Sequence, residues 1–262
     1  MYYLGIDIGS LSCDAVVIDD AERILASAVI PTGARNRESI ARVKTEVLQV
    51  AGIKESDLAA TISTGYGRDR VESRLAAVTE ITCHARGIRF VIPTTQVLVD
   101  IGGQDSKAIR LDKDGRVVDF AMNDKCAAGT GRFLEAMARA LQVDIEDLSK
   151  LDQGAQGTAT LSSMCTVFAE SEVVSLIANG VDIKEIVRGL NRAIASRTLG
   201  LVKRVAGDAA NLTVAMSGGV ALNAGVVRAL GAAVGCDILV PPMPDTIGAL
   251  GAALIAKERH KK

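Results

Sequence analysis

Two cysteines stand in polar, glycine-rich surroundings where their thiols could do chemistry. Cys126 lies in "NDKCAAGTGRFLE" and Cys165 begins "CTVFAESEV", and each precedes a segment with helical periodicity. The other cysteines, Cys13, Cys83 and Cys236, lie in apolar segments, where we expect small buried thiols in a strand, a helix and a strand, respectively. Five cysteines without close pairing do not indicate a disulfide framework. Cys126 and Cys165 are therefore the candidate metal ligands.

Four thiolates are the usual ligands of a [4Fe–4S] cluster, and this chain offers two in comparable loop-to-helix settings. Cys126 and Cys165 are 39 positions apart (165 − 126), so no local knuckle joins them. A homodimer with both cysteines near its twofold axis would supply four thiolates to one shared cluster. Two alternatives stay open at this point: a zinc site with the same ligands, and two buried structural thiols.

The segments that follow the two cysteines have the spacing of amphipathic helices. Gly129 and Gly131 would let the backbone approach a bound cluster and donate N–H groups to its sulfur atoms. We expect each cysteine at the start of its helix, where the helix dipole favours the anionic thiolate by about 0.3–1 kcal/mol. The predicted apolar faces consist of Phe133, Leu134, Met137 and Leu141 in the first helix and of Val167, Val174 and Ile177 in the second.

An internal repeat places an aspartate before a glycine turn twice, which is a second kind of candidate chemistry. "LGIDIGSLSCDAVVIDDAER" aligns without a gap with "LVDIGGQDSKAIRLDKDGR" at an offset of 93 positions, so that Asp7 matches Asp100 (100 − 7) and Gly9 matches Gly102. Each copy is typical of a strand ending in aspartate, a tight glycine turn, a second strand and an acidic turn. The repeat predicts a duplicated domain.

The two glycine turns are predicted to bind phosphate groups. Backbone N–H groups in such turns can approach anionic oxygens, and the duplication would place one turn on each wall of an interdomain cleft. Asp7 and Asp100 would hold Mg²⁺ mainly through water, and Gln104 or Asp105 could orient an attacking water. The candidate phosphate contacts are Gly9, Ser10, Ser12, Gly102 and Gly103.

A third glycine turn, "SGGVALN", follows a later apolar strand. Ser217, Gly218 and Gly219 are predicted to face an adenosine or ribose, and Asn223 would add a polar contact. No GxxxxGKS or GxxxxGKT stretch occurs in the sequence, so the predicted phosphate site is not a Walker-type loop. The three turns together predict binding of ATP or ADP with Mg²⁺.

The elements that must position these residues alternate between strands and helices, which predicts an α/β fold. Residues 36–52 carry Ile40, Val43, Val47 and Val50 at helical spacing and stop at a glycine. Short strands are predicted in "LAATISTGYG", "TQVLVDIGG" and "CDILVPP", and "DTIGALGAALIAKERHKK" is typical of a helix. We expect domains at residues 1–95 and 96–262, with the C-terminal helix as a candidate to pack back on the first domain.

Composition narrows the classes of protein. In a chain of 262 residues, a hydrophobic content of 48% suits a sizeable core of buried sheet flanked by helices. A net charge of −1, with no Trp and few other aromatic residues, argues against a nucleic-acid-binding protein. No apolar run approaches the ~18–20 residues of a membrane span, and the first residues lack the layout of a signal peptide. We therefore expect a cytoplasmic protein without a membrane partner.

"DIGS", "DIGGQDSK", "SGGVALN" and "PDTIGALGAA" resemble the phosphate, adenosine and closing segments of the acetate kinase, sugar kinase, Hsp70 and actin superfamily. That resemblance implies duplicated ribonuclease-H-like domains of the actin ATPase type, with mixed, largely parallel sheets and flanking helices. The two cysteine motifs closely resemble the activator ATPases of 2-hydroxyacyl-CoA dehydratases, of the BadF/BadG/BcrA/BcrD type, a branch shared with subunits of benzoyl-CoA reductase. The resemblance covers nearly the whole chain.

The resemblance implies an ATP-driven donor of single low-potential electrons. A homodimer with one [4Fe–4S] cluster would take an electron from ferredoxin or flavodoxin. It would pass the electron to a 2-hydroxyacyl-CoA dehydratase or a related iron–sulfur CoA-ester reductase, and domain closure on ATP would change the exposure of the cluster. A small-molecule kinase of the sugar type and a nucleotide-switched interaction module stay open as alternatives. The segment "STGYGRDR", residues 63–70, is predicted to be a loop with exposed basic residues that could touch a partner protein.

Overall fold

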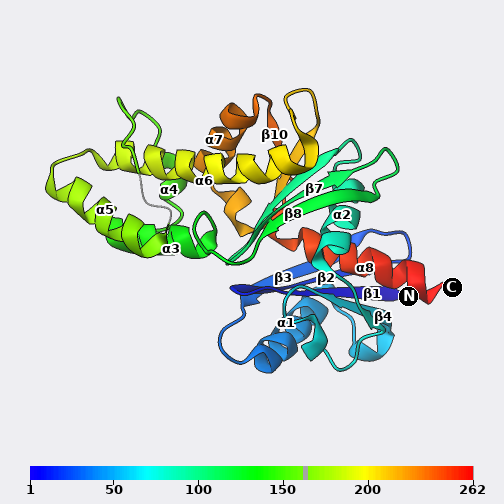
Figure 1. Cartoon of the computed structure of the whole chain (residues 1–262). Helices are drawn as coiled ribbons and strands as arrows, with labels where there is room; N and C mark the ends of the chain where they lie inside the picture. Colours follow the sequence, from blue (N-terminus) through cyan, green and yellow to red (C-terminus); the bar gives the residue numbers. More distant parts are fainter. Residues whose placement is uncertain (162–164, 262) are drawn as a thin grey trace. The chain divides into compact units, whose positions relative to one another are not determined.

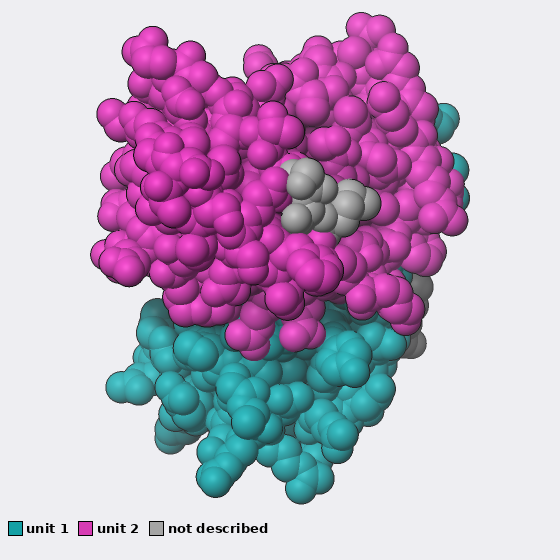
Figure 2. Space-filling view, turned by 60° about the vertical axis from the view of Figure 1, so that its left-hand side comes forward, with its two compact units in different colours: residues 1–96, 111–118, 241–262 teal, residues 97–110, 119–240 magenta. Residues whose placement is uncertain are grey.

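The computed structural model describes residues 1–161 and 165–261 of the chain (Figure 1). They form two compact units, coloured teal and magenta in Figure 2. Unit 1 consists of Met1–Gln96, Leu111–Val118 and Pro241–Lys262, and unit 2 consists of Val97–Arg110 and Asp119–Val240. The segment after residue 240 therefore belongs to unit 1 although it follows unit 2 in the chain.

Unit 1 is built around a five-stranded sheet with the strand order β3-β2-β1-β4-β5. β1 is antiparallel to β2, and β2 is antiparallel to β3, whereas β4 is parallel to both β1 and β5. The sheet is mixed because hairpin partners must run antiparallel, while strands reached by a crossover run parallel. The bounds are β1 (Tyr2–Ile8), β2 (Ser12–Asp19), β3 (Ile24–Pro31), β4 (Leu58–Thr64) and β5 (Ala76–Ala77).

The second sheet, most of which lies in unit 2, has the order β10-β9-β6-β7-β8. This is the order of the first sheet when β6 to β10 are matched with β1 to β5 one by one. β6 is antiparallel to β7 and parallel to β9, as β1 is to β2 and β4. The duplicated α/β fold with mixed sheets is therefore confirmed. The bounds are β6 (Val97–Ile101), β7 (Ser106–Leu111), β8 (Val117–Asn123), β9 (Val214–Ser217) and β10 (Ile238–Leu239).

The duplication extends to individual hydrogen bonds. The Gly9 amide donates to the Ser12 carbonyl at 2.9 Å, and 93 positions later the Gly102 amide donates to the Asp105 carbonyl at 3.0 Å. The acidic turns also match, because one carboxylate oxygen accepts the amides two and four positions further on in each copy. The two sets are Asp19 with Ala21 and Arg23, and Asp112 with Asp114 and Arg116. The gap-free alignment therefore corresponds to the same backbone geometry.

Unit 1 has three long helices: α1 (Asn36–Ala51), α2 (Glu80–Val91) and α8 (Ile247–His260). α1 and α8 pack against the sheet, whereas α2 packs against α8. α1 ends at Gly52 in a left-handed conformation, as its sequence predicts, but Val50 faces solvent and only the other three predicted positions are buried. Small residues let α8 approach the sheet, because a Cβ on Gly5 would lie closer than 3.0 Å to the Ala249 carbonyl oxygen. Short 3-10 turns occur at Glu55–Asp57, Arg68–Arg70, Gly219–Leu222 and Pro244–Thr246.

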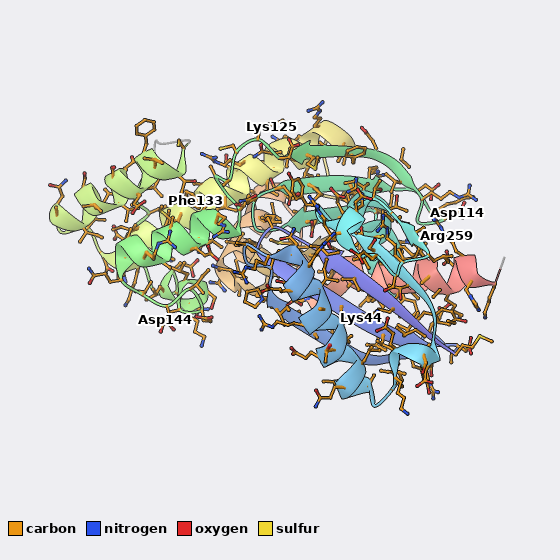
Figure 3. The ribbon with its side chains drawn as sticks, turned by 90° about the horizontal axis from the view of Figure 1, so that it is seen from below. Lys44, Asp114, Lys125, Phe133, Asp144 and Arg259 are labelled. Carbon is orange, nitrogen blue, oxygen red and sulfur yellow. The ribbon has the colours of Figure 1, made fainter. Side chains whose placement is uncertain are left out.

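The helices of unit 2 include the two that follow the candidate cysteines. Their bounds are α3 (Gly131–Leu141), α4 (Leu148–Leu151), α5 (Thr166–Ala178), α6 (Ile183–Ala206) and α7 (Ala224–Val234). α3 packs its predicted apolar face into the core, where Phe133 and Met137 are buried with Val173 of α5 and Ile186 of α6. Figure 3 labels Phe133 on α3. Among the described residues, no helix combines the length and the apolar character needed to cross a membrane.

Candidate functional site

The strand-end carboxylate of unit 2, Asp100 at the end of β6, is buried in a network of polar side chains. Its Oδ1 accepts a hydrogen bond from Ser217 Oγ at 2.8 Å, and its Oδ2 lies 3.3 Å from Lys107 Nζ. Lys107 also forms an ion pair with Asp105 at 2.8 Å. The structure therefore brings together three residues that the sequence nominated for nucleotide binding: Asp100, Asp105 and Ser217.

Lys107 is a component of this network that sequence reasoning missed. It is only 4% exposed, so its charge is balanced by the two neighbouring aspartates rather than by solvent. Its position was available from the repeat, because residues 100 and 107 face each other across the predicted hairpin. Gln104, by contrast, is exposed in the turn between β6 and β7, where it can contact a bound molecule or water.

The turn after β9 requires glycine at one position. Gly218 has φ 84° and ψ 164°, and a Cβ there would lie closer than 3.0 Å to the Ile101 carbonyl oxygen and 3.0 Å from Asp100 Oδ1. This conformation is essentially restricted to glycine. Gly219 begins a 3-10 turn and borders open space. The backbone after β9 is therefore held directly against the carboxylate at the end of β6.

Asn223 has a structural role in addition to the ligand contact predicted for it. Its Oδ1 accepts hydrogen bonds from the amides of Gly225 and Val226 at 2.9 and 3.2 Å, so it caps the N-terminus of α7. Its Nδ2 has no hydrogen-bond partner among the described residues. This amide nitrogen is itself buried.

The glycine turn of unit 2 is bonded to the segment that carries Cys126. The amide of Gly131 donates to the Gly102 carbonyl, and the amide of Arg132 donates to the Gly103 carbonyl, both at 2.9 Å. The buried Thr130 hydroxyl lies 2.9 Å from the Gly103 carbonyl oxygen and 2.6 Å from that of Ala127. A candidate phosphate loop and the N-terminus of α3 are thus one hydrogen-bonded unit.

The strand-end carboxylate of unit 1, Asp7, faces a second carboxylate. Asp7 and Asp14 are directly opposite each other in the β1–β2 pairing, and both are buried. Burial, and then the neighbouring Asp7, raise the pKa of Asp14 well above its usual range. Asp14 was not singled out from the sequence. The same hairpin turn contains Gly9, Ser10 and Ser12, which are half-buried.

His84 of α2 and Gly248 of α8 complete the surroundings of Asp7. A Cβ on Gly248 would lie closer than 3.0 Å to both Asp7 Oδ2 and His84 Cε1, so glycine keeps this space open. His84 Nδ1 lies 2.9 Å from the Glu80 carbonyl oxygen. His84 is buried, and the ring is thereby oriented beside the carboxylate.

The loop at residues 63–70 occupies in unit 1 the place of the "SGGVALN" turn in unit 2. Thr64 pairs with Asp7 as Ser217 pairs with Asp100, and Gly65 has φ 83°, close to the value for Gly218. The tip of this loop is exposed, with Tyr66 at 90%. Arg68 is not a free basic residue, because it forms an ion pair with Glu80 at 3.1 Å.

The five cysteines separate by exposure. Cys13 in β2 and Cys83 in α2 are buried, as predicted, and burial raises the pKa of both thiols to about 12. Cys126 and Cys165 are exposed, so the alternative of two buried thiols is wrong. Cys236 is half-buried, and the prediction that it lies in a strand is also wrong. Its amide donates to the Gly231 carbonyl at the end of α7, and β10 begins two residues later.

The two exposed cysteines differ in their relation to the helices. Cys165 is the N-cap of α5, as predicted, and its carbonyl accepts the first helical hydrogen bond, from Ala169, at 2.9 Å. Cys126 lies five positions before α3, because a turn at 127–130 separates it from the helix. The prediction that each cysteine stands at the start of its helix is therefore confirmed for Cys165 and wrong for Cys126. Figure 3 labels the neighbouring Lys125.

Two further expectations about these segments need correction. The amide of Gly131 cannot donate to a cluster sulfur, because it already donates to the Gly102 carbonyl. The predicted apolar residues of α5 are not buried: Val167 is 67% exposed, while Ala169 and Val173 on another face contact the core. Phe168 is also 67% exposed. The exposed apolar side chains of α5 form a surface that we call the α5 patch, which consists of Val167, Phe168, Val174 and Ile177.

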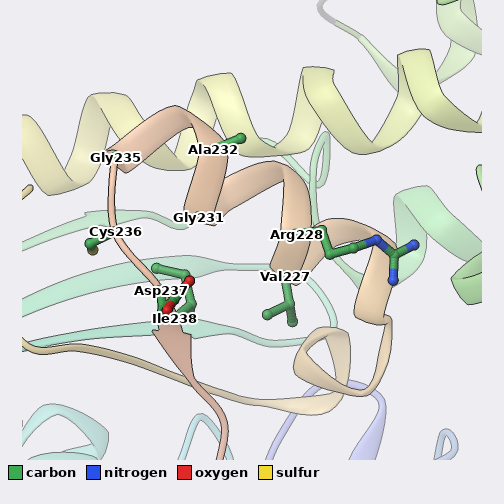
Figure 4. Close-up of a pocket in the computed structure, with 8 residues that line it drawn as sticks. All are labelled: Val227, Arg228, Gly231, Ala232, Gly235, Cys236, Asp237 and Ile238. Atoms are coloured by element: carbon green, nitrogen blue, oxygen red, sulfur yellow. The ribbon is translucent and has the colours of Figure 1, made fainter.

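A hollow elsewhere in unit 2 contains none of the nominated residues. It lies beside the C-terminal half of α7 and the segment that leads to β10 (Figure 4). The hollow is lined by Val227, Arg228, Gly231, Ala232, Gly235, Cys236, Asp237 and Ile238.

Within residues 1–161 and 165–261, no group of three or more His, Cys, Asp or Glu side chains is arranged to hold a metal ion.

Comparisons with known proteins place these features in context. Residues 4–256 match the model of the BadF/BadG/BcrA/BcrD ATPase family. The chain is 48% identical over 262 residues to the activator of lactoyl-CoA dehydratase from Anaerotignum propionicum, covering 100% of both chains. It is 42% identical to the activator of the 2-hydroxyisocaproyl-CoA dehydratase from Clostridium difficile, solved with bound ADPNP, with a TM-score of 0.94 over 100% of this chain and 96% of that one. A ROK family glucokinase from Streptomyces griseus, 16% identical with a TM-score of 0.60 over 98% and 100% of the two chains, shares the fold alone.

Proposed function

The chain belongs to the BadF/BadG/BcrA/BcrD ATPase family, and we infer that it is the activating ATPase of a 2-hydroxyacyl-CoA dehydratase. Full-length relatives with 42–48% identity carry this activity in their names. The likeness to the glucokinase shows the fold alone. The observation that carries the inference within this chain is the set of hydrogen bonds between the Gly102–Gly103 turn and the Thr130–Arg132 segment, which connects a phosphate loop to a cysteine loop.

We propose that activation consists of the transfer of one electron at low potential. A [4Fe–4S] cluster, when bound, would supply one-electron redox chemistry. Cys126 and Cys165 are exposed, so their thiolates are able to bind a metal centre that lies at the surface of the chain. This exposure fits a metal centre that is also bound by the thiolates of a second chain. A reduced ferredoxin or flavodoxin would lose the electron, and the dehydratase or a related iron–sulfur CoA-ester reductase would gain it.

The thiolates of one chain are half of a four-thiolate set, so the proposal includes a homodimer. The α5 patch supports it, because apolar side chains that begin two positions after Cys165 are exposed in the single chain. A second copy on this surface would bury the patch beside the shared ligands. An exposed apolar surface next to ligand residues is a typical feature of a protein interface.

For the nucleotide, we propose that unit 2 contributes the turn residues Gly102, Gly103, Ser217, Gly218 and Gly219, with the exposed Gln104 orienting water for hydrolysis. Lys107 would donate a hydrogen bond from its ammonium group to a phosphate oxygen beside Asp100, although its charge is shared with Asp100 and Asp105. Asp105 is engaged by Lys107, so we assign it to positioning that lysine. Gly9, Ser10 and Ser12 would provide the corresponding turn of unit 1.

Coupling between nucleotide and cluster would follow the hydrogen bonds from the Gly102–Gly103 turn to Thr130. If a γ-phosphate displaces this turn, Thr130 and the loop before it must move with the turn, or these hydrogen bonds must break. Such coupling requires that ATP bind one arrangement of the loop more tightly than the other, since equal affinity would shift no equilibrium.

Anaerobic purification tests the proposal. The dimer should contain about four iron atoms, and Cys126→Ser or Cys165→Ser should remove them, whereas Cys236→Ser, a matched control at a half-buried thiol, should leave the iron content unchanged. Zinc in place of iron, or a metal-free monomer, would show that the electron-transfer proposal is wrong. Phosphorylation of a sugar by the metal-free protein would instead support the kinase alternative.

A further inference from the structure

The two copies of the duplicated hairpin differ in the charge that faces the strand-end aspartate. In unit 2 the residue opposite Asp100 is Lys107, with Nζ 3.3 Å from the carboxylate. In unit 1 the residue opposite Asp7 is Asp14. The registers are identical, so the same cross-strand position carries a cation in one copy and an acid in the other. Side chains at directly opposed positions lie on the same face of the sheet, with Cβ atoms about 4.5–5.5 Å apart.

Asp14 is buried without full compensation from the protein. It is 5% exposed, and Ser12 Oγ lies 3.1 Å from its Oδ2. Its Oδ1 has no hydrogen-bond partner among the described residues. The charged groups near it are Asp7 and Asp245, which repel its anionic form, and His84. A buried carboxylate in this situation must be neutralised, either by a proton or by a cationic partner.

A divalent cation meets this requirement. Mg²⁺ is commonly held by one or two carboxylates, with water and nucleotide phosphates completing its octahedron. A site of this kind agrees with the finding that no three acidic, histidine or cysteine side chains in the described part of the chain form a complete metal cage. In unit 2 the ammonium group of Lys107 already occupies the equivalent position.

We propose that Asp14 joins Asp7 in holding the divalent cation that accompanies the nucleotide, directly or through water, and that Lys107 gives unit 2 the phosphate-binding role instead. The two halves of the duplication would thereby have complementary tasks: the acidic pair binds the metal, and the Lys107 ammonium group donates hydrogen bonds to phosphate oxygens. This inference rests on the proposed Mg²⁺-dependent nucleotide binding.

Binding of Mn²⁺ to the intact dimer in the presence of ADP tests this proposal, with free Mn²⁺ measured by its electron paramagnetic resonance signal. Asp14→Asn keeps the shape of the side chain and should weaken Mn²⁺ binding by about 10- to 100-fold, the range seen when groups supporting a metal site are lost. Asp144→Asn, at an exposed carboxylate labelled in Figure 3, should bind Mn²⁺ like the unmodified protein.

Asp14→Lys is the second variant, because it reproduces the pair that unit 2 already accommodates; it should fold and bind no Mn²⁺ at this site. An unchanged Mn²⁺ affinity in Asp14→Asn would overturn the inference and indicate that the two carboxyl groups share a proton instead. ADP affinity measured without metal provides the independent arm. If the unmodified protein does not bind ADP, the proposed function fails; if ADP binds but Mn²⁺ ignores Asp14, only this inference fails.

Discussion

Replacement of Gly218 by alanine tests how the nucleotide turn is supported. The backbone at this position, φ 84° and ψ 164°, costs a residue with a Cβ about 1–3 kcal/mol. The new Cβ would also lie closer than 3.0 Å to the Ile101 carbonyl oxygen, so the ends of β6 and β9 must move apart. Overpacking of this kind typically costs about 1–3 kcal/mol more. We expect the free energy of unfolding of unit 2 to fall by about 4 kcal/mol, the middle of the summed range of about 2–6 kcal/mol.

Two alanine controls separate conformational strain from the steric clash. Gly180→Ala also has a positive φ, 77°, but borders open space, so it should lose only about 1–2 kcal/mol. Gly219→Ala has neither feature and should be close to neutral. Urea denaturation followed by circular dichroism gives the stabilities, and calorimetry gives ADP affinity, which should fall only for Gly218→Ala, because its Cβ also approaches Asp100. If Gly218→Ala is no less stable than Gly180→Ala, the steric part of the reasoning is refuted.

Three further outcomes are expected. Iodoacetamide at about pH 8 should modify the exposed Cys126 and Cys165 in the metal-free folded protein, as shown by peptide mapping. It should not modify the buried Cys13 and Cys83, because their pKa of about 12 suppresses the thiolate. Equal labelling of the two pairs would contradict this assignment. The backbone amide of Arg116 holds the pKa of Asp112 below its usual value, so this carboxylate stabilises the fold above its usual pKa and the contribution is lost as pH falls through the lowered one. Asp112→Asn should therefore lower the melting temperature at neutral pH, and the difference should vanish in strong acid. Lys107→Met leaves Asp100 buried without its cationic partner and should cost about 3–5 kcal/mol in urea denaturation, with Lys107→Arg as the control; a loss below about 1 kcal/mol would be inconsistent with a buried ion pair.

Much of the fold could be predicted because the determining signals are local. The duplicated hairpin was visible as a gap-free alignment. The acidic turn requires a carboxylate and a glycine, and both residue types can be recognised in the sequence, as at Asp112 and Gly115. The end of α1 was equally readable, because Gly52 has the left-handed conformation that terminates a helix. The helical periodicity of residues 166–178 was also informative, but it could not say whether Val167 faces the core or solvent.

The candidate site was predicted less completely because its residues meet through pairing of distant segments. The bond between Asp100 and Ser217 joins residues 117 positions apart, and that between Gly103 and Thr130 joins residues 27 apart. Asp14 carries no motif of its own and gains meaning only when it is compared with Lys107 in the other copy. Such a comparison requires the register of both hairpins, which the alignment contained but which only the two sheets make explicit.

The origin of α8 has a consequence for biosynthesis. This helix, which is buried in unit 1 along most of its length, begins 156 positions after α2 ends (247 − 91). At translation rates of about 5–20 residues per second, the ribosome needs roughly 8–30 s to make the intervening polypeptide. During this interval the nascent β1 and β4 lack the helix that covers them, whereas the segments of unit 2 emerge together. Unit 1 is thus synthesised first but is the last unit able to complete its fold. A nascent-chain chaperone would therefore be expected to bind the uncovered strands of unit 1.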